Sequence, residues 1–402
     1  MHLFTDKLPM IYETLRENGI DLWVIIARET ELNSEPVLPG LGDMIFFYGS
    51  ILAFSKEGKM YASISPIDYS GYVGMEGLDD LECYESLTQG LANIIKKVQP
   101  RTIGLNFNEN DPASDGLTAG MMIKVRRVLD EIEFSGEVVS AFPVASRVRS
   151  HKNAYQLEQI TECAYAADQI ARDACDYIEP GMSALDLYNF LQQTAFDRGY
   201  TMAWLPSQCP AVATSGPKGR MGHIGPSDED KIEAGCSITI DYGVRKGSYC
   251  CDIQRTYYVL KPGEVAPPPE LARHFANLRN SIDATAAYMR PGMTGEQVDA
   301  FVREKLRSFG YRADFRHGLG HQVGFVAHDG GPVLAPSSIE WYNRYELIGA
   351  PIQEGYVFTL EPNLGIRQGL RPALEEMVVV RENGGQFISN CQKEIYLIRS
   401  FQ

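Results

Sequence analysis

The spacing of apolar residues divides the first 150 residues into alternating helices and strands. Residues 22–27 (LWVIIA) are apolar without interruption, which is typical of a strand buried on both faces, whereas 87–98 repeats apolar residues at helical spacing. The same criteria predict helices at 10–18 and 121–132, and strands at 44–54, 60–64 and 102–107. Helices that alternate with buried strands predict an α/β domain over residues 1–150.

A short basic and polar stretch, RVRSHKN at 147–153, follows this region and is interpreted as a linker. Helical spacing resumes over 155–177 and opens a second domain, 151–402. The first domain has no glycine-rich phosphate-binding loop between a strand and a helix. We therefore expect the chemistry to reside in the second domain.

The second domain contains an internal repeat. EPGMSALDLYNFLQQTAFDRGY at 179–200 matches RPGMTGEQVDAFVREKLRSFGY at 290–311, and both copies share Pro-Gly-Met, a Ser or Thr helix cap and a closing Gly-Tyr. Further along, AGCSITIDYG at 234–243 aligns with EGYVFTLEPN at 354–363. Each copy lacks a complete core, so we expect the two copies to pack about a pseudo-two-fold axis.

The repeat brings four carboxylates together. Asp241 and Asp252 lie at the facing ends of a predicted β-hairpin whose turn is at 246–248. In the second copy Glu361 aligns with Asp241, and Glu375 occupies the place that Asp252 holds in the first. The four side chains should therefore converge between the copies.

Like charges at a buried site cannot all stay ionised, so one carboxylate pair would require either a shared proton or a bound cation. Four carboxylates favour the cation, and two divalent metal ions would neutralise them. Oxygen ligands with one imidazole suit Mn, Co, Zn or Fe better than Ca, without choosing among the four.

The imidazole is best sought in RHGLGHQVGFVAHDGGP at 316–332, where His321 and His328 are seven residues apart. His223, in a glycine-rich segment before the first hairpin, is either a loop histidine or a catalytic one. The remaining histidines are interpreted as ordinary core or surface side chains: His2, His151, His274 and His317.

Composition restricts the partners. The net charge is 37 minus 52, or −15, which argues against nucleic acid and anionic membranes. The longest apolar run, 44–54, is too short to span a bilayer, and the N-terminus lacks a basic-then-apolar signal design, so we expect a cytoplasmic protein. The eight cysteines are scattered and should be reduced; buried inert thiols are the preferred interpretation of Cys250 and Cys251 over a thiol nucleophile.

Together the motifs resemble those of the pita-bread metallopeptidases: prolidase, aminopeptidase P and methionine aminopeptidase. They are DYG with an aspartate eleven residues after its own, GHxxG with a histidine seven residues on, TxEP, and a final glutamate in a strand. The resemblance covers roughly 150–402, and the first 150 residues look like the creatinase-type domain of the proline-specific members. It implies an α+β fold in which an α/β domain precedes a C-terminal pita-bread domain.

By that resemblance Asp241 would bind one metal ion, and His321 and Glu361 the other. Asp252 and Glu375 would bridge both ions. His223 and His328 match positions that hydrogen-bond the scissile carbonyl and stabilise the tetrahedral intermediate, and Glu361 would transfer the proton as a metal-bridging hydroxide attacks the amide. The implied substrate is a small peptide, cleaved before a proline in second position, and the implied assembly is a homodimer.

Four departures from the family pattern keep other functions open. Ala373 stands where an arginine is usual, with Arg371 as a candidate replacement; Gln254 replaces a threonine; and Glu376 replaces an aspartate. The tyrosine that often follows TxEP is missing from EPNLG at 361–365. The first hypothesis is an Xaa-Pro metallopeptidase. The second is a hydrolase or lyase of the same fold that acts on a non-peptide molecule. The third, a non-catalytic binding protein, is disfavoured because all five predicted ligands are retained.

Overall fold

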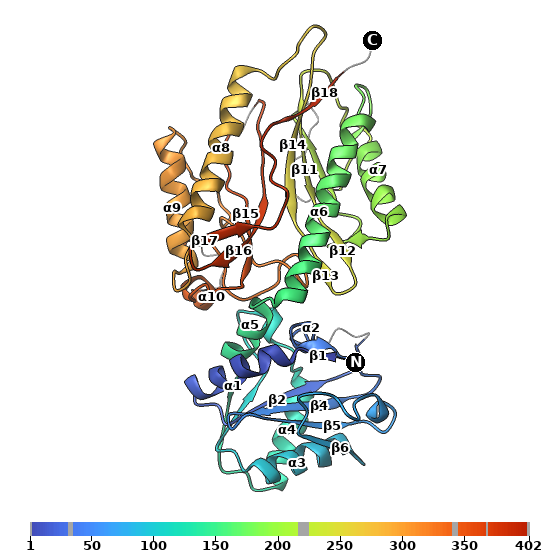
Figure 1. Cartoon of the computed structure of the whole chain (residues 1–402), viewed down its shortest axis with the longest axis vertical. Helices are drawn as coiled ribbons and strands as arrows, with labels where there is room; N and C mark the ends of the chain where they lie inside the picture. The colour runs from blue at the N-terminus through green and yellow to red at the C-terminus, as the bar shows by residue number, and fades with distance from the viewer. Residues whose placement is uncertain (1, 31–34, 216–224, 340–344, 367–368, 400–402) are drawn as a thin grey trace. The chain divides into compact units, whose positions relative to one another are not determined.

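The computed structural model describes residues 2–30, 35–215, 225–339, 345–366 and 369–399. The chain forms two compact units, Met1–Asn153 and Ala154–Gln402, which are described separately (Figure 1). No helix in the described ranges is both long enough and apolar enough to cross a membrane.

The first unit is a three-layer α/β structure around a six-stranded sheet of order β6-β5-β4-β2-β7-β8. Its strands are β1 (His2–Leu3), β2 (Leu22–Ala27), β3 (Gly42–Asp43), β4 (Ser50–Ser55), β5 (Lys59–Ile64), β6 (Asp80–Cys83), β7 (Thr102–Leu105) and β8 (Glu137–Ser140). Its α-helices are α1 (Leu8–Glu17), α2 (Leu38–Leu41), α3 (Leu87–Val98), α4 (Ala119–Glu131) and α5 (Phe142–Ser150).

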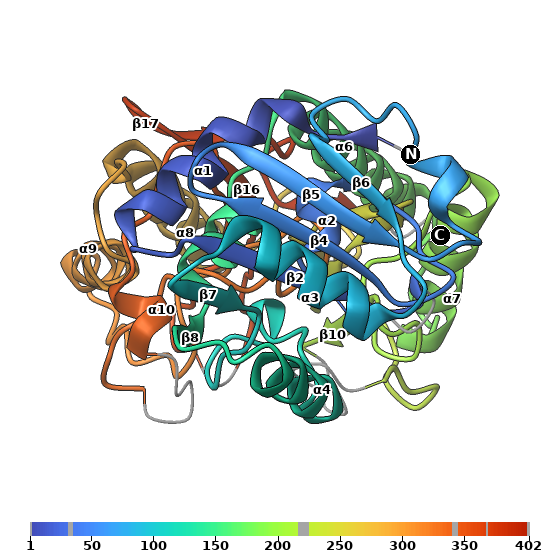
Figure 2. The same ribbon diagram turned by 90° about the horizontal axis from the view of Figure 1, so that it is seen from below.

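Strand β2 shows why the predicted apolar run is continuous. Trp23 and Ile25 pack in one cluster with residues of α1 and α5, whereas Leu22 and Val24 pack in another with residues of α3 and α4. Figure 2 shows α3 in front of the strands, on its face of the sheet. Successive side chains of a strand point to opposite faces, so a strand covered on both sides needs apolar residues throughout.

One expectation for this unit is wrong. The strand predicted at 44–54 begins only at Ser50, because the N–H groups of Phe47 and Tyr48 bind the Asp68 carboxylate instead of a neighbouring strand.

The stretch at 147–153, interpreted as a linker, contains the end of α5 at Ser150, and the two compact units divide directly after it at Asn153. Lys152 in this stretch is buried and donates to the Arg149 carbonyl oxygen.

The second unit consists of two similar halves, as the repeat predicted. Its α-helices are α6 (Ala154–Tyr177), α7 (Ala184–Asp197), α8 (Pro269–Tyr288), α9 (Gly295–Ser308) and α10 (Tyr345–Gly349). Helices α7 and α9 both begin with a capping box, built on Ser183 with Asp186 and on Thr294 with Gln297. The repeated Ser or Thr is therefore the same structural device in both halves.

Two sheets lie between these helices (Figure 1). One has the order β10-β11-β14-β18 and the other β15-β16-β17, with a small third sheet β13-β12-β9. The strands are β9 (Thr201–Met202), β10 (Ala211–Thr214), β11 (Ser237–Tyr242), β12 (Val244–Lys246), β13 (Tyr249–Cys250), β14 (Ile253–Val259), β15 (Val357–Leu360), β16 (Glu376–Arg381), β17 (Gly384–Phe387) and β18 (Tyr396–Ile398). The two main sheets meet at a bridge between Gln254 and Glu375.

Candidate metal centre

The predicted hairpin places the first two carboxylates. Strands β11 and β14 pair antiparallel with Asp241 opposite Gln254, and β12 and β13 close the hairpin around the turn at Gly247. Asp252 immediately precedes β14, two residues before Gln254. Residues two apart in a strand share a face, so Asp241, Asp252 and Gln254 point toward the same side.

The second half supplies its carboxylates in the same way. Strands β15 and β16 pair antiparallel, with Leu360 opposite Glu376. Glu361 therefore directly follows β15, and Glu375 directly precedes β16. Both predicted ligands lie at the strand ends that face the first sheet.

His321 is fixed against β15 by its backbone. Its N–H donates to the Thr359 hydroxyl at 3.1 Å, and its carbonyl oxygen accepts from the Thr359 N–H at 2.9 Å. A Cβ on Gly320 would lie 2.0 Å from the Thr359 carbonyl oxygen, so glycine is required for this approach. As a result His321 Nε2 lies 3.8 Å from Asp252 Oδ2 and 3.6 Å from Glu361 Oε1.

The electrostatics of the cluster show the cost of gathering these carboxylates. Burial, and then the charges of Asp241 and Glu361, raise the pKa of Asp252 well above its ordinary value. Burial and the charges of Asp252 and Glu361 do the same to the pKa of Glu375. The pKa of Glu361 is raised to about 8 by burial and by Asp241. The metal-free cluster therefore favours protonated carboxyls, and a bound cation would reverse that preference.

The donor set fits a divalent transition metal. Asp252, His321 and Glu375 each offer a ligand atom, and these atoms all lie within 4.8 Å of one another. Asp252 Oδ1 and Glu375 Oε1 are buried and have no hydrogen-bond partner among the residues that the structure describes. Buried polar atoms are normally satisfied, so two such oxygens in one cluster mark a place for a cation.

His328 and His223 are the two histidines predicted to be catalytic. The exposed ring of His328 lies beside His321, with 4.4 Å between the ring centroids. His223 lies outside the described residues.

Cys250 and Cys251 are buried, and burial raises the pKa of Cys250 to about 12, which agrees with inert thiols.

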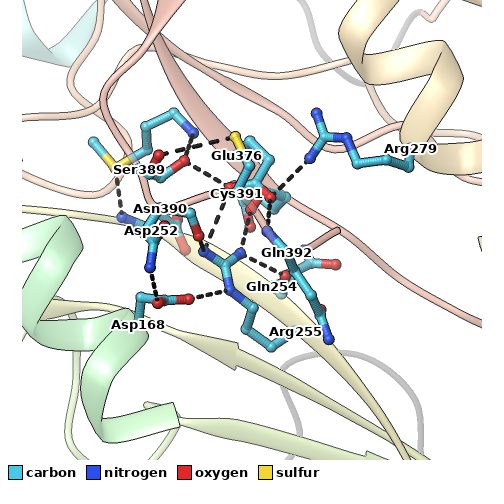
Figure 3. A network of polar contacts seen from close by, with 12 residues as sticks. Asp168, Asp252, Gln254, Arg255, Arg279, Glu376, Ser389, Asn390, Cys391 and Gln392 are labelled. Carbon is cyan, nitrogen blue, oxygen red and sulfur yellow. Dashed lines mark hydrogen bonds and ion pairs between the residues drawn. The ribbon is translucent and has the colours of Figure 1, made fainter. Parts of the chain in front are cut away.

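Behind the carboxylates lies a buried ionic network that the sequence motifs did not reveal (Figure 3). Arg255 uses all its donors there: Nε bonds Asp168 at 2.9 Å, Nη1 bonds the carbonyl oxygens of Gln254 and Glu375, and Nη2 bonds the Asn390 carbonyl oxygen and lies 3.4 Å from Glu376. The sequence signal for this role of Arg255 was its position three residues after Asp252, a predicted metal ligand.

The sequence analysis also did not predict that Gln254 contacts the carboxylate cluster. Its Nε2 lies 3.4 Å from Asp241 Oδ2 and 3.4 Å from Glu361 Oε2. The alternation of side chains along β14 from Asp252 was the available signal.

Comparisons with known proteins identify the family of the chain. Residues 158–382, more than half of the chain, match the family model Peptidase_M24, described as metallopeptidase family M24. The chain is 25% identical over 357 residues to the uncharacterized peptidase YqhT of Bacillus subtilis, which covers 88% of this chain and 92% of that protein. It is 23% identical over 405 residues to an Xaa-Pro dipeptidase of Pyrococcus horikoshii, which covers 98% and 100%.

A solved structure of an Xaa-Pro dipeptidase from Bacillus anthracis superposes with a TM-score of 0.72 at 20% identity, covering 98% of this chain and 99% of that one. This similarity, with the family match, confirms the predicted pita-bread fold.

Proposed function

The chain belongs to metallopeptidase family M24, and from that premise we propose that it is a dinuclear peptidase that cleaves Xaa-Pro bonds in dipeptides or at the N-terminus of peptides. The observation that carries the proposal is the buried cluster of carboxylates around His321, in which two oxygens have no protein partner among the described residues. Divalent ions, when bound, would neutralise these carboxylates, lower the pKa of a water to roughly 7 and polarise the scissile carbonyl.

We assign the ligands by their positions in the two halves. Asp241 would hold one ion, and His321 with Glu361 the other. Asp252 and Glu375, the most buried of the four carboxylates, would contact both ions. Mn, Co, Zn and Fe all suit this donor set.

Glu361 is proposed to move the proton. Its side chain is 20% exposed, against 7% for Asp252, so it lies on the more accessible side of the cluster. In this role Glu361 accepts the proton of the attacking water and returns it to the amine that leaves.

His328 is proposed to contact the substrate. Its ring is exposed and adjacent to the ring of His321, which suits a donor that bonds the scissile carbonyl oxygen and stabilises the negative charge developing there. His223 remains a predicted second donor.

Proline specificity is supported by the relatives named Xaa-Pro dipeptidase and is tested with a substrate panel. Metal-loaded protein is offered Xaa-Pro dipeptides, Xaa-Pro-Yaa tripeptides and the matching Xaa-Ala peptides. We expect turnover of Xaa-Pro peptides at least about 100-fold above that of the alanine series, or about 3 kcal/mol of transition-state discrimination. Equal turnover of both series would contradict proline specificity but not peptidase activity.

A second candidate, a hydrolase or lyase of non-peptide molecules, is favoured by Ala373. Its N–H and carbonyl oxygen both bond the Thr256 hydroxyl, and the side chain offers no charge to a peptide carboxylate. Arg371 lies four residues before Glu375, which is about 13 Å of extended chain at about 3.3 Å per residue. Ala373 lies only two residues before Glu375, so Arg371 can lie up to twice as far from Glu375 as the position of the usual arginine. Failure of every peptide in the panel, with metal bound, would favour this second function.

A further inference from the structure

His328 lies on a short loop at 322–329 that is closed by its own hydrogen bonds. The Asp329 N–H donates to the Gln322 carbonyl oxygen at 2.9 Å, which joins the two ends of the loop. The Asp329 carboxylate accepts from the Phe325 N–H at 3.2 Å, which ties the middle of the loop to the same end. The position of the His328 ring therefore depends on how this loop as a whole is held.

Two groups of the first half bind consecutive carbonyl oxygens of this loop. The Cys250 N–H donates to the Gly324 carbonyl oxygen at 2.7 Å. Arg245 Nη1 donates to the next carbonyl oxygen, that of Phe325, at 2.9 Å. Arg245 and Cys250 lie opposite each other in the β12–β13 pair, which closes the hairpin between the two proposed ligands of the first half. The loop is thus attached to that hairpin.

The two neighbouring histidines are consequently fixed by different halves of the unit. His321 is held within the second half, because its backbone N–H and carbonyl oxygen both bond Thr359 of β15. His328 is held by a loop that the first half anchors. The distance of 4.4 Å between the two ring centroids therefore depends on contacts between the loop and the hairpin.

Arg245 is well placed to act as a fixed anchor. It lies in β12, the central strand of the small sheet, where it pairs with Cys250 on one side and with Thr201 on the other. Its Nη2 also donates to the Ala203 carbonyl oxygen at 3.2 Å. A planar guanidinium that bonds two chain segments at once holds both in a defined geometry, because its donors form a rigid fork.

We propose that Arg245 is a positioning residue for the reaction, which holds the loop at 322–329 against the first hairpin and so places the His328 ring beside the metal centre. This inference rests on the proposed role of His328 in the peptidase. Arg245 acts through that ring and not through a metal ligand. Its loss should therefore slow the reaction and leave metal binding intact, since a catalytic group must be held close to its productive geometry.

Hydrogen exchange tests the anchoring without an assay. Mn²⁺-loaded wild type is compared with Arg245→Met, with Arg245→Gln as a second variant, and with the matched control Arg290→Met. Arg290 also bonds two carbonyl oxygens, through Nη1 at 2.7 and 2.6 Å, but at the end of α8. Circular dichroism identifies any variant that fails to fold.

The amides of 322–329 should exchange at least about tenfold faster in the Arg245 variants than in wild type and in Arg290→Met, because the loop has lost an anchor. Unchanged exchange in this segment would overturn the inference, whatever the variants do in an assay.

A double-mutant cycle with His328→Ala tests the route by which Arg245 acts. On an Xaa-Pro peptide, Arg245→Met should lower kcat by at least about tenfold, with bound Mn²⁺ unchanged and KM changed by less than about threefold. Arg290→Met should keep the kcat of wild type. In the His328→Ala background, Arg245→Met should lower kcat by less than about twofold, because the ring that Arg245 positions is gone.

Equal losses of kcat in both backgrounds would overturn the inference, since Arg245 would then act independently of His328. Absence of turnover in wild type would instead contradict the proposed peptidase function. In that case the exchange measurement would still decide whether Arg245 anchors the loop.

Discussion

Asp252 combines burial, a strongly raised pKa and an oxygen without a hydrogen-bond partner among the described residues. Asp252→Asn should lower Mn²⁺ occupancy from about two ions per chain to below about one, because an amide is a weaker ligand than a carboxylate. Elemental analysis after gel filtration measures this. The metal-free variant should also melt no lower than metal-free wild type, since one source of repulsion is gone.

The control for this prediction is Asp197→Asn, which alters an exposed aspartate on α7 and should leave occupancy unchanged. Full occupancy in Asp252→Asn would remove this residue from the ligand set.

Glu35 is a buried carboxyl of the first unit that accepts a hydrogen bond from Asn106 Nδ2 at 2.9 Å. Burial raises its pKa to about 7. The folded-state pKa lies above the unfolded value, so the folded chain binds more protons between about pH 4.5 and 7. Stability is therefore greatest below this window and is lost as the pH rises through it, by about 3 kcal/mol for the shift of about 2.5 units.

Glu35→Gln keeps the oxygen that accepts from Asn106 and removes the titration. Urea unfolding at about pH 4 and about pH 8, with Mn²⁺ saturating, should show wild type losing about 3 kcal/mol more than Glu35→Gln. Parallel pH profiles for the two proteins would contradict the buried, raised pKa.

At the scale of elements, Arg255 stabilises the place where β14 meets Glu375, the residue that precedes β16. Its guanidinium binds backbone oxygens on both sides of that junction and faces two carboxylates, Asp168 and Glu376 (Figure 3). Burial alone would lower the pKa of Arg255, but Glu376 and Asp168 hold it above its ordinary value. The proposed ligands Asp252 and Glu375 are thus positioned by an ion network that lies behind them.

Arg255→Met should lower the free energy of unfolding by about 3 to 5 kcal/mol, because it removes the buried cation that Asp168 and Glu376 share and the donor to the Glu375 carbonyl oxygen. Arg172→Met is the matched control. It removes another arginine that bonds Asp168, at 2.7 Å, but from a side chain that is 41% exposed, so the loss should stay below about 1 kcal/mol. Chemical denaturation measures both, and equal losses would show that the buried position of Arg255 is not decisive.

At the scale of the whole molecule, we propose that the chain forms a homodimer through an exposed apolar surface of the first unit. That surface consists of Ile45, Phe47, Tyr48, Ile67 and Val73, each more than half exposed. The two segments that carry it are joined, because Tyr72 bonds the Ile45 carbonyl oxygen and Asp68 bonds the Phe47 N–H. Exposed apolar patches of this kind mark interaction sites.

Phe47→Glu should convert the dimer to a monomer, because it places a charge in an apolar interface. Light scattering coupled to size exclusion measures the mass. Ile123→Glu, at an exposed apolar residue of α4 in the same unit, should leave the mass unchanged. A wild type that elutes as a monomer would refute the dimer itself.

Much of the architecture could be predicted from the sequence, because it is encoded locally. The helix caps at Ser183 and Thr294 and the alternation along β11 depend on neighbours within a few residues. The repeat then paired Asp241 with Glu361, and strand geometry placed both at strand ends that face each other. The buried cluster around His321 follows from these local patterns.

Other features were decided only in the tertiary structure. Residues 44–49 look like a strand, but contacts with Asp68, some twenty residues later, hold part of this segment outside the sheet. Arg255 donates to the Glu375 carbonyl oxygen and Gln254 forms a β-bridge with Glu375, although Glu375 is more than a hundred residues away in the sequence. A sequence pattern determines toward which face a side chain points, because backbone periodicity is local. Which partner it meets there depends on how distant strands align, and that register is set by packing across the whole unit.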